Sequence, residues 1–202
     1  MKLYHSPASP FVRKVMVVLH ETGQVDDVEV VPVAVTAVSP SDLLIAKNPL
    51  SKIPALERDA GPTLYDSRVI CAYLDDRAGG RLYQQGSGKW DQLTLEATAD
   101  GILDAAVLMV YEGRVRPPEK QFDGWIDAQW QKVDRTLGAL EARWMPNLSG
   151  QIDIGQIAVG CALSYLDFRH GDRDWRKGRP ALASWYEDFA GRSSMVATEP
   201  QG

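Results

Sequence analysis

The pattern of the chain changes at Gly79-Gly80, and this change limits the folds that the chain can adopt. Before the two glycines, short runs that suit strands alternate with stretches of helical periodicity. After a polar stretch, apolar residues recur at helical spacing almost to the end. This contrast predicts two domains, an α/β domain over residues 1–79 and an all-helical domain over residues 89–202, with residues 80–88 as the linker.

The first half predicts the order strand, helix, strand, a connection, then strand, strand, helix. A strand–helix–strand unit implies two parallel strands joined by a right-handed crossover. The turn Asp59-Ala60-Gly61-Pro62 implies a hairpin between the last two strands. The result is a four-stranded mixed sheet with helices against it. The predicted strands are residues 2–5, 27–35, 55–58 and 63–65, and the predicted helices begin at Pro10 and at Asp66-Ser67.

The second half predicts a bundle of amphipathic helices. Pro117-Pro118 interrupts the periodicity once, and Pro180 is suited to the first turn of the last helix. Asp153 precedes a long apolar run and is predicted to cap the helix that follows. The predicted helical stretches are residues 89–111, 125–144, 153–168 and 180–189.

Charge and composition exclude several classes of protein. The net charge is −5, whereas a nucleic-acid binder normally presents a basic face. No stretch approaches the roughly 20 apolar residues that span a bilayer, and the first residues lack the apolar core of a signal peptide. We therefore expect a cytoplasmic protein without membrane contact. Cys71 and Cys161 lie in apolar runs away from any histidine pair, so we expect core residues and no metal site.

The first motif whose residues could take part in binding or catalysis is Ser9-Pro10-Phe11-Val12-Arg13-Lys14, directly after the first predicted strand. Ser9 suits a helix N-cap and Pro10 the first helical position. A helix N-terminus offers unpaired N–H groups and a positive dipole end, which would stabilise a thiolate. Ser9 could donate a hydrogen bond to that thiolate, and Arg13 could add positive potential. The alternative is a helix start without any further role.

The second motif is Asn48-Pro49-Leu50-Ser51-Lys52-Ile53-Pro54-Ala55-Leu56. Pro54 stands where a strand begins, the position in which a missing N–H is tolerated. If the bond before Pro54 is cis, the backbone of Ile53 can pair with an extended peptide ligand, with Lys52 nearby for a carboxylate. An ordinary turn before a strand is the alternative.

The third motif is Asp66-Ser67 at the start of a predicted helix. The Ser67 hydroxyl and backbone N–H suit a carboxylate, and Asp66 suits an ammonium group. A plain N-cap is the alternative reading.

Together and in this order, the three motifs resemble those of the glutathione-transferase family, in particular bacterial members with a serine in the active site. The matching residues are 9–14, 48–56 and 64–74, and the run 157–169 in the second half also looks like the family. The resemblance covers essentially the whole chain. It implies a thioredoxin-like first domain, an all-helical second domain, and glutathione as the co-substrate. One departure is Ser51, where the family often has glycine.

The resemblance also implies roles for individual residues. Ser9 would hydrogen-bond the glutathione sulfur and favour its thiolate, without being the nucleophile, and Phe11 would lie near that sulfur. Lys52 would bind the glycine carboxylate. The backbone of Ile53 would pair with the cysteinyl backbone, and the peptide bond before Pro54 would be cis. Asp66 and Ser67 would hold the γ-glutamyl end.

The resemblance gives less specific information about the second substrate, the electrophile. Val107 and Tyr111 lie where a family member lines its electrophile pocket, and packing within the bundle explains them equally well. The expected reaction is transfer of glutathione to a small hydrophobic electrophile by a cytoplasmic homodimer. Peroxide reduction, dehalogenation and isomerisation on the same scaffold remain alternatives, as does a non-catalytic binding or interaction protein.

Overall fold

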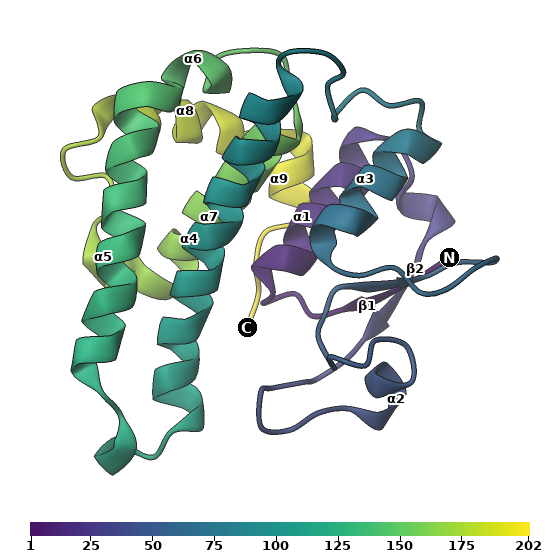
Figure 1. Cartoon of the computed structure of the whole chain (residues 1–202), viewed down its shortest axis with the longest axis horizontal. Coiled ribbons are helices and arrows are strands. Elements are labelled where there is room, and N and C mark those ends of the chain that lie inside the picture. The colour runs from purple at the N-terminus through teal and green to yellow at the C-terminus, as the bar shows by residue number, and fades with distance from the viewer. The chain divides into compact units, whose positions relative to one another are not determined.

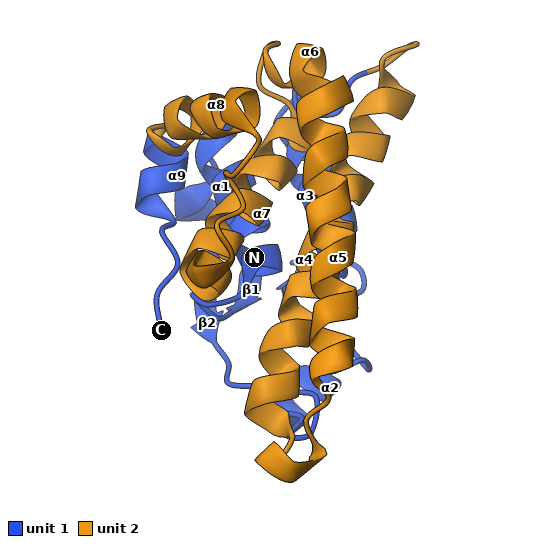
Figure 2. Cartoon of the chain, turned by 90° about the vertical axis from the view of Figure 1, so that its left-hand side faces the viewer, with its two compact units in different colours: residues 1–84, 193–202 blue, residues 85–192 orange.

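The computed structural model describes residues 1–202 and divides the chain into two units (Figure 2). Unit 1 comprises residues 1–84 and 193–202, and unit 2 comprises residues 85–192. Unit 1 is a mixed α/β structure, whereas unit 2 contains helices only. The predicted fold class is therefore confirmed.

Unit 1 is built on a small mixed sheet. Its central strand β1 (Lys2–His5) pairs in parallel with β2 (Glu29–Pro32) and antiparallel with β3 (Ala55–Glu57). The fourth predicted strand is reduced to one bridge, in which Leu56 and Leu64 exchange two backbone hydrogen bonds of 2.9 Å. The sheet thus has the predicted mixed order, with a very short outer strand.

The helices of unit 1 cover both sides of this sheet. In Figure 1, α1 (Pro10–Glu21) and α3 (Ser67–Arg77) lie on one side, and the short α2 (Asp42–Ile45) lies on the other. α1 and α3 pack against each other. A 3-10 turn, Val25–Asp27, precedes β2, so this strand begins later than the sequence predicts.

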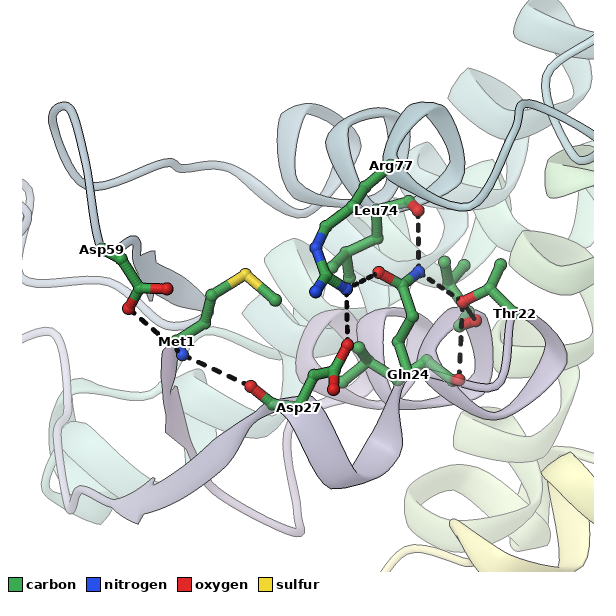
Figure 3. Close-up of polar contacts among 9 residues, drawn as sticks. Met1, Thr22, Gln24, Asp27, Asp59, Leu74 and Arg77 are labelled. Atoms are coloured by element: carbon green, nitrogen blue, oxygen red, sulfur yellow. Dashed lines mark hydrogen bonds and ion pairs between the residues drawn. The ribbon is translucent and has the colours of Figure 1, made fainter.

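The C-terminal ends of α1 and α3 are joined by the buried side chain of Gln24 (Figure 3). Its Nε2 donates to the carbonyl of Leu74 and to Thr22 Oγ1, each over 2.8 Å. Arg77 donates to Gln24 Oε1 and also to Asp27 Oδ2, the latter over 2.7 Å. These bonds fix the two helices relative to each other, and the N-termini of both helices carry predicted site residues.

The end of the chain returns to unit 1. Helix α9 (Ser193–Ala197) packs on α1. The buried guanidinium of Arg13 donates to the carbonyl of Met195 over 3.0 Å, and Ser194 Oγ donates to Glu21 over 2.5 Å. Arg13 therefore helps to hold the C-terminal segment, a role that the sequence did not suggest.

Unit 2 is a helical bundle around a buried helix. The most buried element is α7, in which only the end nearest His170 reaches solvent. A Cβ atom on Gly160 would lie 2.4 Å from the ring of Phe189, so glycine permits this close approach of α8. The helices are α4 (Lys89–Val115), α5 (Asp123–Ala139), α6 (Met145–Leu148), α7 (Ile154–His170) and α8 (Pro180–Ala190), with 3-10 turns at Pro118–Lys120 and Gly171–Arg173 and a π-helical turn at Leu140–Trp144.

The cap predicted for α7 is confirmed, and it yields a stability prediction. Asp153 is buried, and its Oδ1 accepts a 3.0 Å hydrogen bond from the N–H of Gln156. We expect Asp153→Ala to lower the free energy of unfolding by about 0.5–2 kcal/mol, because the N–H loses its partner. Urea unfolding followed by circular dichroism measures this change. A variant as stable as the wild type would contradict the role of the cap.

Three further sequence expectations can be compared with the structure. Cys71 and Cys161 are both buried, as expected for small core residues. No group of three or more histidine, cysteine, aspartate or glutamate side chains is placed to hold a metal ion. None of the helices combines the length and apolar character that a membrane crossing requires.

Candidate active site

The register of the sheet brings the three motifs of unit 1 to one end of it. Tyr4 near the end of β1 pairs with Ala55 at the start of β3, so Pro54 lies beside the segment that leads from β1 to Ser9. Leu64 pairs with Leu56, and Asp66 therefore follows at the end of the sheet where Pro54 lies. The topology thus gathers three motifs that lie between residues 9 and 67 of the sequence.

Ser9 caps α1 and still retains a hydrogen to donate. Its Oγ accepts a 3.3 Å hydrogen bond from the N–H of Val12. A hydroxyl carries one donor in addition to its two lone pairs, and the hydroxyl hydrogen of Ser9 has no acceptor within the chain. Capping and donation to a ligand are therefore compatible. Phe11, in the first turn of the same helix, is half-buried.

The loop before β3 is held by its own polar groups. The side chain of Asn48 donates to the carbonyl of Lys52 over 2.8 Å and accepts from the N–H of Leu50 over 3.0 Å. Ser51 adopts a φ of 51°, the left-handed region that favours glycine. Its Oγ accepts a hydrogen bond of 3.2 Å from the N–H of Ser41. The serine at this position thus adopts the backbone conformation that suits a glycine.

Backbone and charge in this loop are available to a ligand. The Ile53–Pro54 peptide bond is cis, as the resemblance implies, and the backbone N–H and C=O of Ile53 have no partner within the chain. Lys52 is exposed, and its ammonium group forms no ion pair within the chain. An extended peptide could therefore pair with Ile53 while Lys52 meets its carboxylate.

The N-terminus of α3 presents both an anion and a free hydroxyl. Asp66 caps the helix by accepting a 3.0 Å hydrogen bond from the N–H of Arg68, whose guanidinium also contacts the second carboxylate oxygen over 3.0 Å. Ser67 is only 2% exposed, and its hydroxyl has no hydrogen-bond partner within the chain. Its oxygen is not fully enclosed, so a ligand at the surface could pair with this hydroxyl.

Asp66 stays ionised in the neutral range. Burial raises the pKa of its carboxyl, but the hydrogen bonds and positive charge of Arg68, together with the charge of Lys14, hold that pKa below its ordinary value. Lys14 is fully buried on α1. Its influence on Asp66 could not be predicted from the sequence, because only the packing of α1 against α3 brings the two residues together.

The residues proposed for the electrophile belong to unit 2. Val107 and Tyr111 are both half-buried on α4. They are four residues apart and therefore share one face of the helix.

A cavity of about 230 Å³ in unit 1 lies beside the predicted site, and of the residues named for that site only Arg13 lines it. Its walls are His5, Ser6, Pro7, Arg13, Met16, Ala197, Thr198, Glu199 and Gln201.

Both parts of the chain match described families. Residues 3–82 match the family described as "Glutathione S-transferase, N-terminal domain", and residues 123–188 match "Glutathione S-transferase, C-terminal domain". Among curated relatives, the "Uncharacterized GST-like protein YibF" of Escherichia coli (strain K12) is 32% identical over 206 residues. That alignment covers 99% of this chain and 98% of the relative.

Two crystal structures from Pseudomonas fluorescens Pf-5 are similar to the whole chain. One is a glutathione transferase family member with bound glutathione: it is 50% identical, has a TM-score of 0.96, and the match covers 100% of this chain and 99% of the other. The second is a glutathione transferase family member with bound S-(propanoic acid)-glutathione. It is 48% identical, with a TM-score of 0.92 and full coverage of both chains.

Proposed function

The chain belongs to the glutathione S-transferase family, and we propose that it binds reduced glutathione and transfers it to an electrophile. The observation that carries this proposal is the set of unsatisfied groups at one end of the unit 1 sheet. The hydrogen of Ser9, the backbone of Ile53 and the hydroxyl of Ser67 all lack partners within the chain. The proposed ligand supplies a partner for each.

Glutathione matches these groups in order. Its γ-glutamyl ammonium suits the ionised Asp66, and its γ-glutamyl carboxylate suits the hydroxyl of Ser67 at a helix N-terminus. Its cysteinyl backbone pairs with Ile53, and its glycine carboxylate meets Lys52. Glutathione bound to the similar Pseudomonas protein supports this choice of ligand.

The proposed chemistry begins at the sulfur. Ser9 donates a hydrogen bond to it, and the N-terminus of α1 adds a favourable potential, so the pKa of the bound thiol falls and its proton leaves to solvent. The thiolate then attacks an electrophile, which we assign to the face of α4 that carries Val107 and Tyr111. The thioether bound to the second Pseudomonas structure is a product of the same bond type. We further propose that the protein acts as a cytoplasmic homodimer.

Calorimetric titration with reduced glutathione tests the proposed binding. We expect Ser67→Ala to raise the Kd about tenfold, because a hydrogen bond to a carboxylate is lost. Since this hydroxyl has no partner within the chain, the variant should unfold at the same urea concentration as the wild type. Ser87→Ala, at an exposed position, is the matched control. Absence of binding by the wild type at millimolar glutathione would refute the proposal.

A further inference from the structure

The C-terminal end of α7 is held against α4, since His170 Nε2 lies 3.0 Å from the carbonyl oxygen of Ala106. The ring of Tyr165 lies 6.3 Å from the ring of His170, and two tyrosines and two arginines lie near this contact. Tyr111 and Arg114 are three residues apart on α4, and Tyr165 and Arg169 are four residues apart on α7. At these spacings, the members of each pair share one face of their helix. We call these four residues the arginine–tyrosine cluster; all of them belong to unit 2.

The charges of the cluster act on one another across the two helices. Burial is the main reason why the pKa of Arg169 is lowered, and the like charge of Arg114 lowers it further. Burial raises the pKa of Tyr165, which is only 5% exposed, whereas the charges of Arg169 and Arg114 oppose that rise. The nearby Tyr111 raises the pKa of Tyr165 further. All four side chains therefore lie within electrostatic range.

The two arginines differ in how firmly they are held. The guanidinium carbon of Arg169 lies 3.8 Å from the ring centroid of Phe168, which restrains it by stacking. Arg114 is exposed, and its guanidinium forms no hydrogen bond or ion pair within the chain. Arg116, by contrast, is paired with Glu112 over 2.9 Å at the same end of α4. The cluster thus holds one restrained guanidinium and one that is free to meet an anion.

Two neighbouring guanidinium groups repel each other, and an anion bound between them would remove that cost. We propose that the arginine–tyrosine cluster binds the carboxylate of the electrophile, so that the second substrate is a small electrophile carrying an acidic group. The planar guanidinium matches a carboxylate with two parallel hydrogen bonds, and the phenol groups can donate further ones. Val107, one turn before Tyr111, offers apolar contact to the rest of the substrate.

This inference rests on the proposed function, and a matched pair of substrates separates the two. The pair is a chloronitrobenzoate and its carboxamide, each with chlorine para to the carbonyl group and the nitro group ortho to chlorine. In both reactions the glutathione sulfur bonds to the carbon that bears chlorine. Chloride leaves with the bonding electron pair, and the thiol proton goes to solvent. Each kcat/KM is divided by the rate constant of the uncatalysed reaction with glutathione.

We expect the wild type to favour the acid over the amide on this normalised scale. Arg114→Gln should lower the acid-to-amide ratio about tenfold or more, while the rate with the amide changes less than about threefold. Arg169→Gln should lower the same ratio. Arg135→Gln removes an equal charge from an exposed position on α5 and should leave the ratio unchanged.

Two outcomes would overturn the inference. One is a wild type that turns over the amide but does not prefer the acid. The other is an acid-to-amide ratio that neither Arg114→Gln nor Arg169→Gln alters. If neither compound reacts, the proposed function fails. Binding of each compound is then measured by the quenching of tryptophan fluorescence, since all six tryptophans lie in unit 2. The acid must bind the wild type more tightly than the amide does, and Arg114→Gln must remove this difference.

Discussion

Replacement of Ser9 by alanine is expected to lower kcat/KM for glutathione transfer by roughly 100-fold, the usual effect of removing one donor to a developing anion. The Kd of reduced glutathione should change less than about threefold, because Ile53, Asp66 and Ser67 are untouched. Steady-state kinetics and calorimetry on the same preparations measure the two quantities. A loss confined to kcat/KM identifies Ser9 as the group that acts on the sulfur.

Ser9 also caps α1, and this second role needs its own control. Loss of the Val12 bond in Ser9→Ala costs about 0.5–2 kcal/mol of stability, so urea unfolding must accompany the kinetics. Ser9→Thr keeps both the cap and the hydroxyl and should restore most of the activity. Ser6→Ala removes a neighbouring hydroxyl that makes no hydrogen bond within the chain and should behave as the wild type. Full activity in Ser9→Ala would remove Ser9 from the chemistry.

The second large effect is expected at Asp75, a buried residue in the last turn of α3. Its carboxylate accepts three backbone hydrogen bonds, from Arg81 over 2.9 Å, Leu82 over 2.8 Å and Tyr83 over 2.9 Å. Asp75→Ala would leave all three N–H groups without this acceptor. Since a hydrogen bond to a charged group contributes about 1.5–3 kcal/mol and the bond from Leu82 is buried, we expect the free energy of unfolding to fall by about 3 kcal/mol or more.

The neighbouring Asp76 supplies a matched control. It is exposed, and its carboxylate has no partner within the chain, so Asp76→Ala should change stability by less than about 0.5 kcal/mol. Urea unfolding of both variants gives the comparison. Equal stabilities would show that the segment after α3 does not depend on Asp75.

Local signals explain which parts of this fold the sequence predicted. Ser9, Asp66 and Asp153 were recognised because a capping residue acts on the helix that directly follows it. The mixed sheet was predicted from turn residues and from the handedness of the crossover, which are also local rules. The same rules predicted a strand over residues 27–35, which is longer than the observed β2. Asp27 belongs to the 3-10 turn Val25–Asp27, and the strand ends at Pro32.

Several interactions that the sequence did not predict join residues that are distant along the chain. Arg13 reaches Met195, and Gln24 reaches Leu74, with nothing in either local pattern to suggest a partner. The packing of α9 in unit 1 depends on such contacts. Lys14 lay within a recognised motif, yet only tertiary packing brings its charge close to Asp66.

Titration of the thiolate absorbance of bound glutathione tests the central claim most directly. The measurement follows the ultraviolet difference spectrum of the saturated complex against pH, for the wild type and for Ser9→Ala. We expect the wild-type midpoint to lie at least about one pH unit below that of free glutathione, as for other thiols at helix N-termini. The midpoint should move back toward the free value in the variant. A wild-type complex that titrates like free glutathione would contradict the claim that this protein activates the thiol.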